Sequence, residues 1–206
     1  MAKQARALAT RQRVLEGAAE VFEEHGYAAT TMAQILERCG VTKGALYFHF
    51  GSKEKLARAI LDADEKLLAS LVSVDRSPLQ VVIDASHGFA RELQKNVIAR
   101  ASVRLAIEHG TFSRAEFTTH VMWQDGARDL LARARQQGDL LPDIEIDAVA
   151  ETVIAAFTGA QIVSQAVSGR RDLRNRLTNF WKLLLPGIVP ADRVGRFDPA
   201  GTYINV

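Results

Sequence analysis

The stretch from residue 42 to residue 56 constrains the fold of this chain more than any other, because it reads as a short helix followed at once by the start of another. Thr42 can cap the short helix, which places Lys43 and Gly44 in its first turn. Gly44 removes a side chain where a helix backbone can approach another molecule closely. The pattern predicts a short helix with a basic first turn and an open face.

The side chains around this short helix are of the types that contact DNA. Tyr47 and His49 place hydrogen-bonding tips beside apolar neighbours, and Lys53 follows at the start of the next helix. Such a helix suits the major groove, with polar and basic side chains on the phosphates at its ends. A helical corner with solvated lysines is the alternative from this stretch alone.

Two further helices are predicted before it. Residues 30–40 form a short helix, because Thr31 and Gln34 have the spacing of a capping box and Gly40 can end the helix in a left-handed turn. Residues 11–25 carry apolar side chains at helical spacing. Three helices, with a tight turn between the second and third, predict a helix-turn-helix domain.

Residues 11–57 resemble the DNA-binding domain of the TetR family of transcriptional repressors. The matching positions, in order and without gaps, are Phe22, Gly26-Tyr27, Thr30-Thr31, Ile35, Gly40-Val41, Gly44, Leu46-Tyr47, Phe50 and Lys53-Glu54-Leu56. Residues 43–50 are most similar to the γ-butyrolactone receptors, a branch of that family, and this similarity extends over nearly the whole chain. The resemblance implies a dimeric repressor on a roughly palindromic double-stranded DNA operator, released by a small γ-butyrolactone-like effector.

On this interpretation, eight residues contact the operator. They are Arg11, Thr31, Thr42, Lys43, Gly44, Tyr47, His49 and Lys53. We expect Thr42, Lys43 and Gly44 at base edges and the others at phosphates.

Charge is unevenly distributed along the chain. Residues 1–60 contain nine Lys and Arg against six Asp and Glu, whereas the remainder contains seventeen against eighteen. The first thirteen residues contain no acid, which predicts a basic arm that is disordered when free and lies along or in a groove of bound DNA. A solvated, frayed terminus is the alternative.

The rest of the chain reads as helix after helix, without a strand pattern, a repeat or a low-complexity tract. We expect an all-α protein with a helix-turn-helix DNA-binding domain at residues 1–51 and an effector-binding and dimerisation domain at residues 52–206. A long helix is predicted from Ser52 to about Val74. Asp147 and Asp172 are expected to cap the last two long helices.

These last two helices are expected to form the homodimer interface. The helix that follows Asp147 is apolar on more than one face, so it can be buried on both sides. By resemblance, TetR-family proteins pair these helices with their symmetry mates in a four-helix bundle. The expected interface residues are Val153, Phe157, Gln161, Trp181 and Leu184. A monomer with an ordinary helical core is the alternative.

A pocket between helices is the usual place for a small effector. In the γ-butyrolactone receptors a tryptophan lines the ligand pocket, and Trp123 occupies the matching place. From spacing alone, a tryptophan here is more often a core residue than part of a ligand pocket. The expected ligand-binding residues are Asp64, Phe89, Trp123, Phe157 and Gln161. Asp64 and Ala160 stand where that branch tends to carry glutamine and threonine. The effector could therefore be another small molecule, such as an antibiotic, or there could be none.

Several other classes of protein are not supported by the sequence. Cys39 is the only cysteine, and neither a signal peptide nor a run of ~18 apolar residues is evident, so we expect a cytoplasmic protein with no membrane partner. The five histidines lack metal-ligand spacing, and there is no phosphate-binding glycine loop or nucleophile elbow. We expect no enzyme and no cofactor. A DNA-binding protein without an effector is a further alternative.

Overall fold

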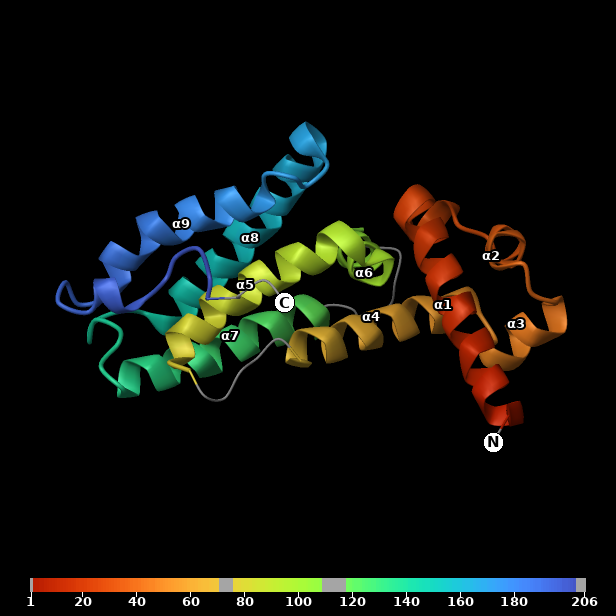
Figure 1. Cartoon of the computed structure of the whole chain (residues 1–206), viewed down its shortest axis with the longest axis horizontal. Coiled ribbons are helices and arrows are strands. Elements are labelled where there is room, and N and C mark those ends of the chain that lie inside the picture. The colour runs from red at the N-terminus through yellow and green to blue at the C-terminus, as the bar shows by residue number, and fades with distance from the viewer. Residues whose placement is uncertain (1, 71–75, 109–117, 203–206) are drawn as a thin grey trace. The chain divides into compact units, whose positions relative to one another are not determined.

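The chain is all-helical, as its sequence predicts (Figure 1). The computed structural model describes residues 2–70, 76–108 and 118–202. The helices in these ranges are α1 (Ala2–Ala29), α2 (Met32–Cys39), α3 (Lys43–His49), α4 (Lys53–Ser70), α5 (Pro78–Lys95), α6 (Val97–Ile107), α7 (Thr118–Gln136), α8 (Ile146–Ser168), α9 (Leu173–Ile188) and the short 3-10 helix η2 (Val194–Arg196). The end of the helix expected to reach Val74 lies outside the described residues.

The chain folds as two compact units, each with its own hydrophobic core. The first unit comprises Met1–Leu67 and Asn96–Thr119, and the second comprises Leu68–Lys95 and His120–Val206. Buried residues of α1, α2, α3, α4 and α6 form the first core, and those of α5, α7, α8 and α9 form most of the second. The domain boundary expected after residue 51 stays a prediction.

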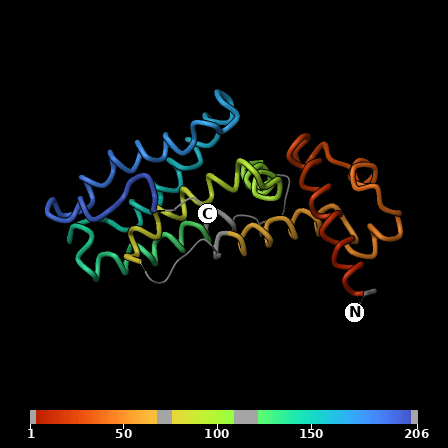
Figure 2. The backbone as a smooth tube through the Cα atoms, in the orientation of Figure 1, coloured from red at the N-terminus to blue at the C-terminus, as the bar shows by residue number. Residues whose placement is uncertain are grey.

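The prediction of a disordered N-terminal arm is wrong. α1 begins at Ala2 rather than near residue 11, so the basic N-terminal residues are helical (Figure 2). The cause is local, because residues 2–9 include alanine, glutamine, arginine and leucine, which are strong helix formers, and contain no glycine or proline. Thr10 also donates a hydrogen bond from its hydroxyl to the carbonyl of Arg6 (2.9 Å), one turn earlier.

The caps of α2 and α3 are those predicted. Thr31 Oγ1 accepts a hydrogen bond from Gln34 N (3.3 Å), and the Gln34 side chain accepts one from Thr31 N (2.8 Å), which completes the capping box. Gly40 ends α2 in the left-handed region, with φ of 60°. Thr42 Oγ1 accepts from Ala45 N at the start of α3 (3.2 Å). The turn between α2 and α3 is therefore determined by residues within it.

The two acidic caps expected further along the chain act differently. The N-cap of α8 is Glu145, which makes no side-chain cap; Asp147 lies in the first turn, where its carboxylate accepts a hydrogen bond from Arg128. Asp172 is the N-cap of α9 by position, but its side chain does not cap the backbone. It accepts instead from the hydroxyls of the preceding helix and from Arg176 (2.8 Å). These contacts tie the end of α8 to the start of α9.

Candidate DNA interface and effector site

The short helix α3 presents one exposed face and buries the other. Lys43, Gly44, Tyr47 and Phe48 are exposed, at the spacing that places them on the same side of a helix, whereas Leu46 is fully buried. A Cβ atom built on Gly44 would have no neighbour within 4 Å, so the chain itself does not require glycine there. The open face fits close approach by another molecule, as expected for base contact.

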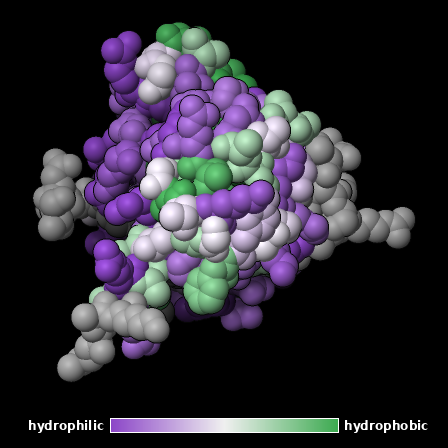
Figure 3. All heavy atoms as spheres, turned by 90° about the vertical axis from the view of Figure 1, so that its right-hand side faces the viewer, coloured by the Kyte–Doolittle hydropathy of each residue, from purple (hydrophilic) through white to green (hydrophobic). Residues whose placement is uncertain are grey.

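Phe48 was missed as a candidate DNA contact. Its side chain is 82% exposed, compared with 44% for Tyr47, and it is one of the most exposed large apolar side chains in the described part of the protein. Figure 3 shows apolar patches on an otherwise mainly hydrophilic face at this end of the molecule. The helical spacing of the buried residues Leu46 and Phe50 could have revealed it, because Phe48 falls between them. An exposed aromatic on such a helix can contact the methyl group of a thymine.

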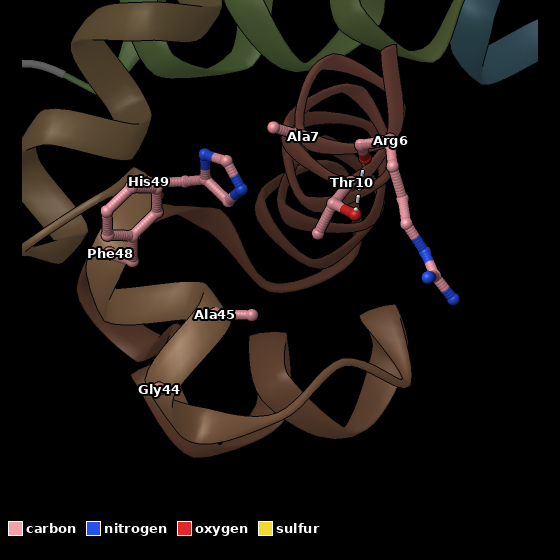
Figure 4. A pocket seen from close by; sticks show the side chains of 7 residues that line it. All are labelled: Arg6, Ala7, Thr10, Gly44, Ala45, Phe48 and His49. Carbon is pink, nitrogen blue, oxygen red and sulfur yellow. Dashed lines mark hydrogen bonds between the residues drawn. The ribbon is translucent and has the colours of Figure 1, made fainter. Parts of the chain in front are cut away.

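His49 lies beside a shallow groove rather than on the open face of α3. This groove of about 480 Å³ is lined by Arg6, Ala7 and Thr10 from α1 and by Gly44, Ala45, Phe48 and His49 from α3. In Figure 4 the two helices face each other across it, and the guanidinium of Arg6 points away into solvent. The helical N-terminus of α1 therefore forms a wall next to α3, and Arg6 joins the residues that could reach a phosphate.

The expected phosphate contact of Lys53 is not supported. Its ammonium donates hydrogen bonds to the carbonyls of Tyr27 (2.8 Å) and Thr30 (2.9 Å) and lies 4.3 Å from the centre of the Tyr27 ring. These carbonyls lie at the end of α1 and just before α2, where a cation is stabilised. Lys53 therefore holds the α1–α2 turn, and neighbouring Lys55 is exposed.

We predict that Lys53→Met lowers the free energy of unfolding by about 1–3 kcal/mol, because two partly buried carbonyls lose a charged donor. Lys55→Met is the matched control and should change unfolding by less than about 0.5 kcal/mol. Denaturant unfolding of both variants tests this. Equal stability of the two, with operator affinity reduced only in Lys53→Met, would return Lys53 to the phosphate contacts.

The remaining candidate DNA residues keep exposed positions. Arg11 is exposed, and its guanidinium carbon lies 4.9 Å from the centre of the Phe50 ring, so it stacks beside the end of α3. Thr31 is exposed at the start of α2, where its hydroxyl donates to Gln34 Oε1 (2.8 Å). Thr42 is exposed at the start of α3. All three stay proposals as DNA contacts.

Charged residues of α6 hold the end of α1. Glu108 accepts a hydrogen bond from the backbone nitrogen of Tyr27 (2.7 Å), and Arg104 donates to both Glu108 (2.8 Å) and the carbonyl of Glu23 (2.7 Å). Gly26 adopts a φ of 75°, and a Cβ there would collide with the Glu108 carboxylate. Glycine is thus needed at position 26, both for its backbone conformation and to leave room for the Glu108 carboxylate. α6 and α4 together position the turn that leads into α2.

Three of the expected effector residues form an aromatic cluster in the second unit. The Phe89 ring centre lies 5.6 Å from that of Trp123, edge to face, and 5.6 Å from that of Phe157. Phe89 and Phe157 are buried, whereas Trp123 is partly exposed. Gln161 lies one turn after Phe157 on α8, is buried, and accepts a hydrogen bond from Arg170 (3.4 Å). Residues from α5, α7 and α8 thus meet in this cluster, and their part in binding an effector stays a prediction.

Asp64 belongs to the first unit and is buried on α4. Its side chain is 0% exposed, and burial raises the pKa of its carboxyl to about 7, an increase that Ser102 offsets only in part. Within the described ranges, neither carboxyl oxygen accepts a hydrogen bond that meets normal geometry.

Most of the residues expected at the dimer interface are buried in their own chain, and the interface itself stays a prediction. Trp181 is 0% exposed, and its indole nitrogen donates to Ser86 Oγ (3.0 Å), so it belongs to the core of its own chain. Val153, Phe157 and Gln161 are also buried within the chain, and Leu184 is partly buried. A side chain that has no exposed surface cannot contact a partner. Of the five expected residues, only Leu184 keeps substantial exposed surface.

The same helices expose other apolar residues. They are Ile162, Val163 and Val167 on α8 and Leu183 on α9. On α8, Val163 and Val167 are one turn apart, Ile162 directly precedes Val163, and none of the three belongs to the buried stripe that includes Val153 and Phe157. By length and composition α8 could cross a membrane, but only 22% of its most apolar window is buried inside the chain. Its two apolar sides fit a helix packed both on its own core and on a second surface.

An exposed recognition face on the second helix of a capped helix-turn-helix, together with a separate helical unit, defines a DNA-binding regulator. Residues 14–60 match the family described as bacterial regulatory proteins of the tetR family, and residues 76–190 match the tetracyclin repressor-like C-terminal domain. The chain belongs to the TetR family. It is a soluble, non-enzymatic transcriptional regulator of that family, and α8 is a helix of its C-terminal domain.

Several relatives are similar over nearly the whole chain. The A-factor receptor protein of Streptomyces griseus is 40% identical over 98% of this chain and 71% of its own. A γ-butyrolactone receptor described as ArpA-like is 34% identical, with a TM-score of 0.81 over 95% of this chain and 96% of its own. CprB from Streptomyces coelicolor, solved with its operator sequence, is 35% identical, with a TM-score of 0.78 over 91% of this chain and 93% of its own.

Proposed function

We propose that this protein is a cytoplasmic, dimeric repressor that binds a pseudo-palindromic operator and is released by a γ-butyrolactone-type signalling molecule. Each protomer carries one α3, so a two-fold dimer presents two reading helices to two half-sites. The effector releases DNA only if it binds the DNA-incompetent state more tightly than the competent one. α4, which follows the helix-turn-helix directly, is the helix through which we expect that change to reach α3.

The aromatic cluster of Phe89, Trp123 and Phe157 is the observation that carries the effector part of this proposal. Trp123 is partly exposed while its two partners are buried, so its indole offers a flat apolar wall. Buried Gln161 adds a polar group one turn away on α8. The similarity to an A-factor receptor and to γ-butyrolactone receptors supports a lactone as the effector.

Trp123→Ala is expected to leave operator affinity within about twofold and to raise the γ-butyrolactone concentration needed for release at least tenfold, because a whole stacking surface is lost. Fluorescence anisotropy of the protein on DNA from its own upstream region, with lactone added to the preformed complex, measures both quantities. Trp123→Phe is the control and should retain partial release. Failure of Trp123→Ala to fold would place Trp123 in the core. Release unchanged from wild type would remove it from the effector site.

Lys43→Ala should weaken operator binding by about 1–3 kcal/mol at fixed salt, because Lys43 is exposed in the first turn of α3 and can pair with a base edge. Lys66→Ala, an exposed position on α4, is the control and should change binding little. Titrations against the operator and against scrambled DNA separate base contact from charge. A loss of equal size on both DNAs would assign Lys43 to a phosphate.

The proposed dimer interface is the set of exposed apolar residues of α8 and α9: Ile162, Val163, Val167 and Leu183. Leu184, which is partly exposed, remains in it, whereas Trp181 does not. Exposed apolar side chains on two helices that pack on each other are the kind of surface that a four-helix bundle buries.

A second candidate function is a receptor-like TetR regulator that does not bind the hormone and responds to another small molecule, or to none. The feature that favours it is the replacement at Asp64, because this position carries an acid where the γ-butyrolactone receptors tend to carry glutamine. In the anisotropy experiment, tight operator binding without release by the lactone would support this candidate and leave the repressor function in place.

A further inference from the structure

Asp64 is a fully buried carboxyl in the described part of the first unit. It lies on α4 close to Ser102 of α6, and it has no exposed surface. Both of its oxygens are recorded without a hydrogen-bond partner in the described residues. A buried carboxyl in this state destabilises the fold, since its charge has lost water and gained nothing in return.

The nearest polar group does not compensate for this loss. Ser102, on α6, is buried, and its hydroxyl donates to the carbonyl of Ala99 (3.1 Å). It lowers the pKa of Asp64 by less than burial raises it, and no described Lys, Arg or His contributes to that pKa or forms an ion pair with Asp64. The carboxyl therefore has neither a counter-charge nor a full set of donors within the described chain.

Binding sites often contain groups that lower the stability of the folded chain. Unpaired buried acids are one such group, because a bound ligand can supply the partner that the protein lacks. Asp62 shows the contrast, because it is an exposed aspartate two residues earlier on the same helix and no such argument applies to it. An asparagine or a leucine would fill the place of Asp64 at a lower cost in free energy.

We propose that Asp64 is the anchor of a binding site for a protonated amine. An ammonium group supplies both the positive charge and two or more N–H donors, so it can satisfy both carboxyl oxygens at once. A hydroxyl would satisfy one oxygen and leave the charge uncompensated. A metal ion would need further ligands, and the described residues contain no group of three or more His, Cys, Asp or Glu that could hold one.

This site is an addition to the proposed release by a lactone. It can be tested without DNA and without a lactone. It assigns to this chain a ligand class that carries a basic nitrogen, in place of a wholly neutral molecule. Since Asp64 has no exposed surface, access requires a local opening beside α4, and slow association is expected.

The test uses the full-length protein and a series of primary alkylamines from butylamine to decylamine, each paired with the alcohol of the same length. Calorimetric titration and thermal shift at neutral pH measure binding. We expect at least one amine of the series to bind the wild type roughly tenfold or more tightly than its alcohol, and Asp64→Asn to remove that difference. Asp62→Asn is the matched control and should keep it.

Two outcomes overturn the proposal. One is that no amine of the series binds the wild type more tightly than its alcohol. The other is that Asp64→Asn keeps the preference for amine, which would place the anchor elsewhere. Because Asp64→Asn removes an unpaired charge, we expect it to fold, and circular dichroism confirms that before binding is measured. Release from the operator by γ-butyrolactone is measured separately, so the proposed function can fail or stand independently of this site.

Discussion

Asp64→Asn is expected to raise the free energy of unfolding by about 2–4 kcal/mol at pH 8. Burial raises the pKa of Asp64 from 3.8 to about 7. Each unit of that difference corresponds to about 1.4 kcal/mol, so ionised Asp64 destabilises the folded chain by roughly 4 kcal/mol. Asparagine is uncharged and similar in shape, but its amide also lacks partners, which removes part of the gain.

The pH dependence of this effect has a definite sign. Between about pH 4 and pH 7 the folded chain keeps a proton on Asp64 that the unfolded chain has lost, so the contribution of Asp64 to stability falls as pH rises through that range. The difference in stability between Asp64→Asn and wild type should therefore grow from pH 4 to pH 8 and then level off. Denaturant unfolding at pH 5 and pH 8 measures it, with Asp62→Asn as the control. A difference independent of pH would mean that Asp64 has an ordinary pKa in the folded chain.

The features that the sequence predicted correctly are local ones. The capping box of Thr31 and Gln34, the left-handed Gly40 and the cap at Thr42 depend on residues within three positions of one another. Interactions of such short range leave a signature in the chain itself. The same holds for the long helices and for the family, whose pattern spans the helix-turn-helix.

The features that the sequence did not predict depend on tertiary contacts, that is, on which distant part of the chain a side chain packs against. Lys53 and Lys55 are both lysines at the start of α4, but only Lys53 reaches the carbonyls that end α1. Trp181 and Leu183 are both apolar on α9, yet one is fully buried and the other is 84% exposed. Helical periodicity identifies two apolar faces, but it cannot say which of them packs on the chain's own core.

The candidate effector site was predicted only in part from the sequence. Resemblance selected Phe89, Trp123 and Phe157, and the structure brings their rings into contact although the residues come from three helices. Spacing places Asp64 on the buried face of α4, four residues after Ile60, but residue type argues against its burial, because an aspartate on a helix is usually solvated. Its cost becomes visible only when the packing around α4 is known.

Leu183→Glu is expected to dissociate the dimer and with it most operator binding. Leu183 is 84% exposed within its own chain, so the substitution should hardly change the stability of a single protomer. In a two-fold interface every substitution occurs twice, and two carboxylates buried near the axis would cost several kcal/mol. We expect the dimer dissociation constant to rise about a thousandfold. A monomer can bind only one half-site. Operator affinity would then lose the whole contribution of the second half-site.

Sedimentation and operator anisotropy, measured on the same samples, separate the causes of a loss of binding. Leu183→Ala is the matched control, because it keeps an uncharged helix surface and should retain a weaker dimer. If Leu183→Glu is monomeric and folded but still binds a single half-site, the dimer interface lies on α8 and α9 and the helix-turn-helix is intact. If it remains a dimer with full operator affinity, Leu183 lies outside the contact. The interface would then have to be sought on α8 alone, at Ile162, Val163 and Val167, whose exposed side chains are the other apolar surface on this pair of helices.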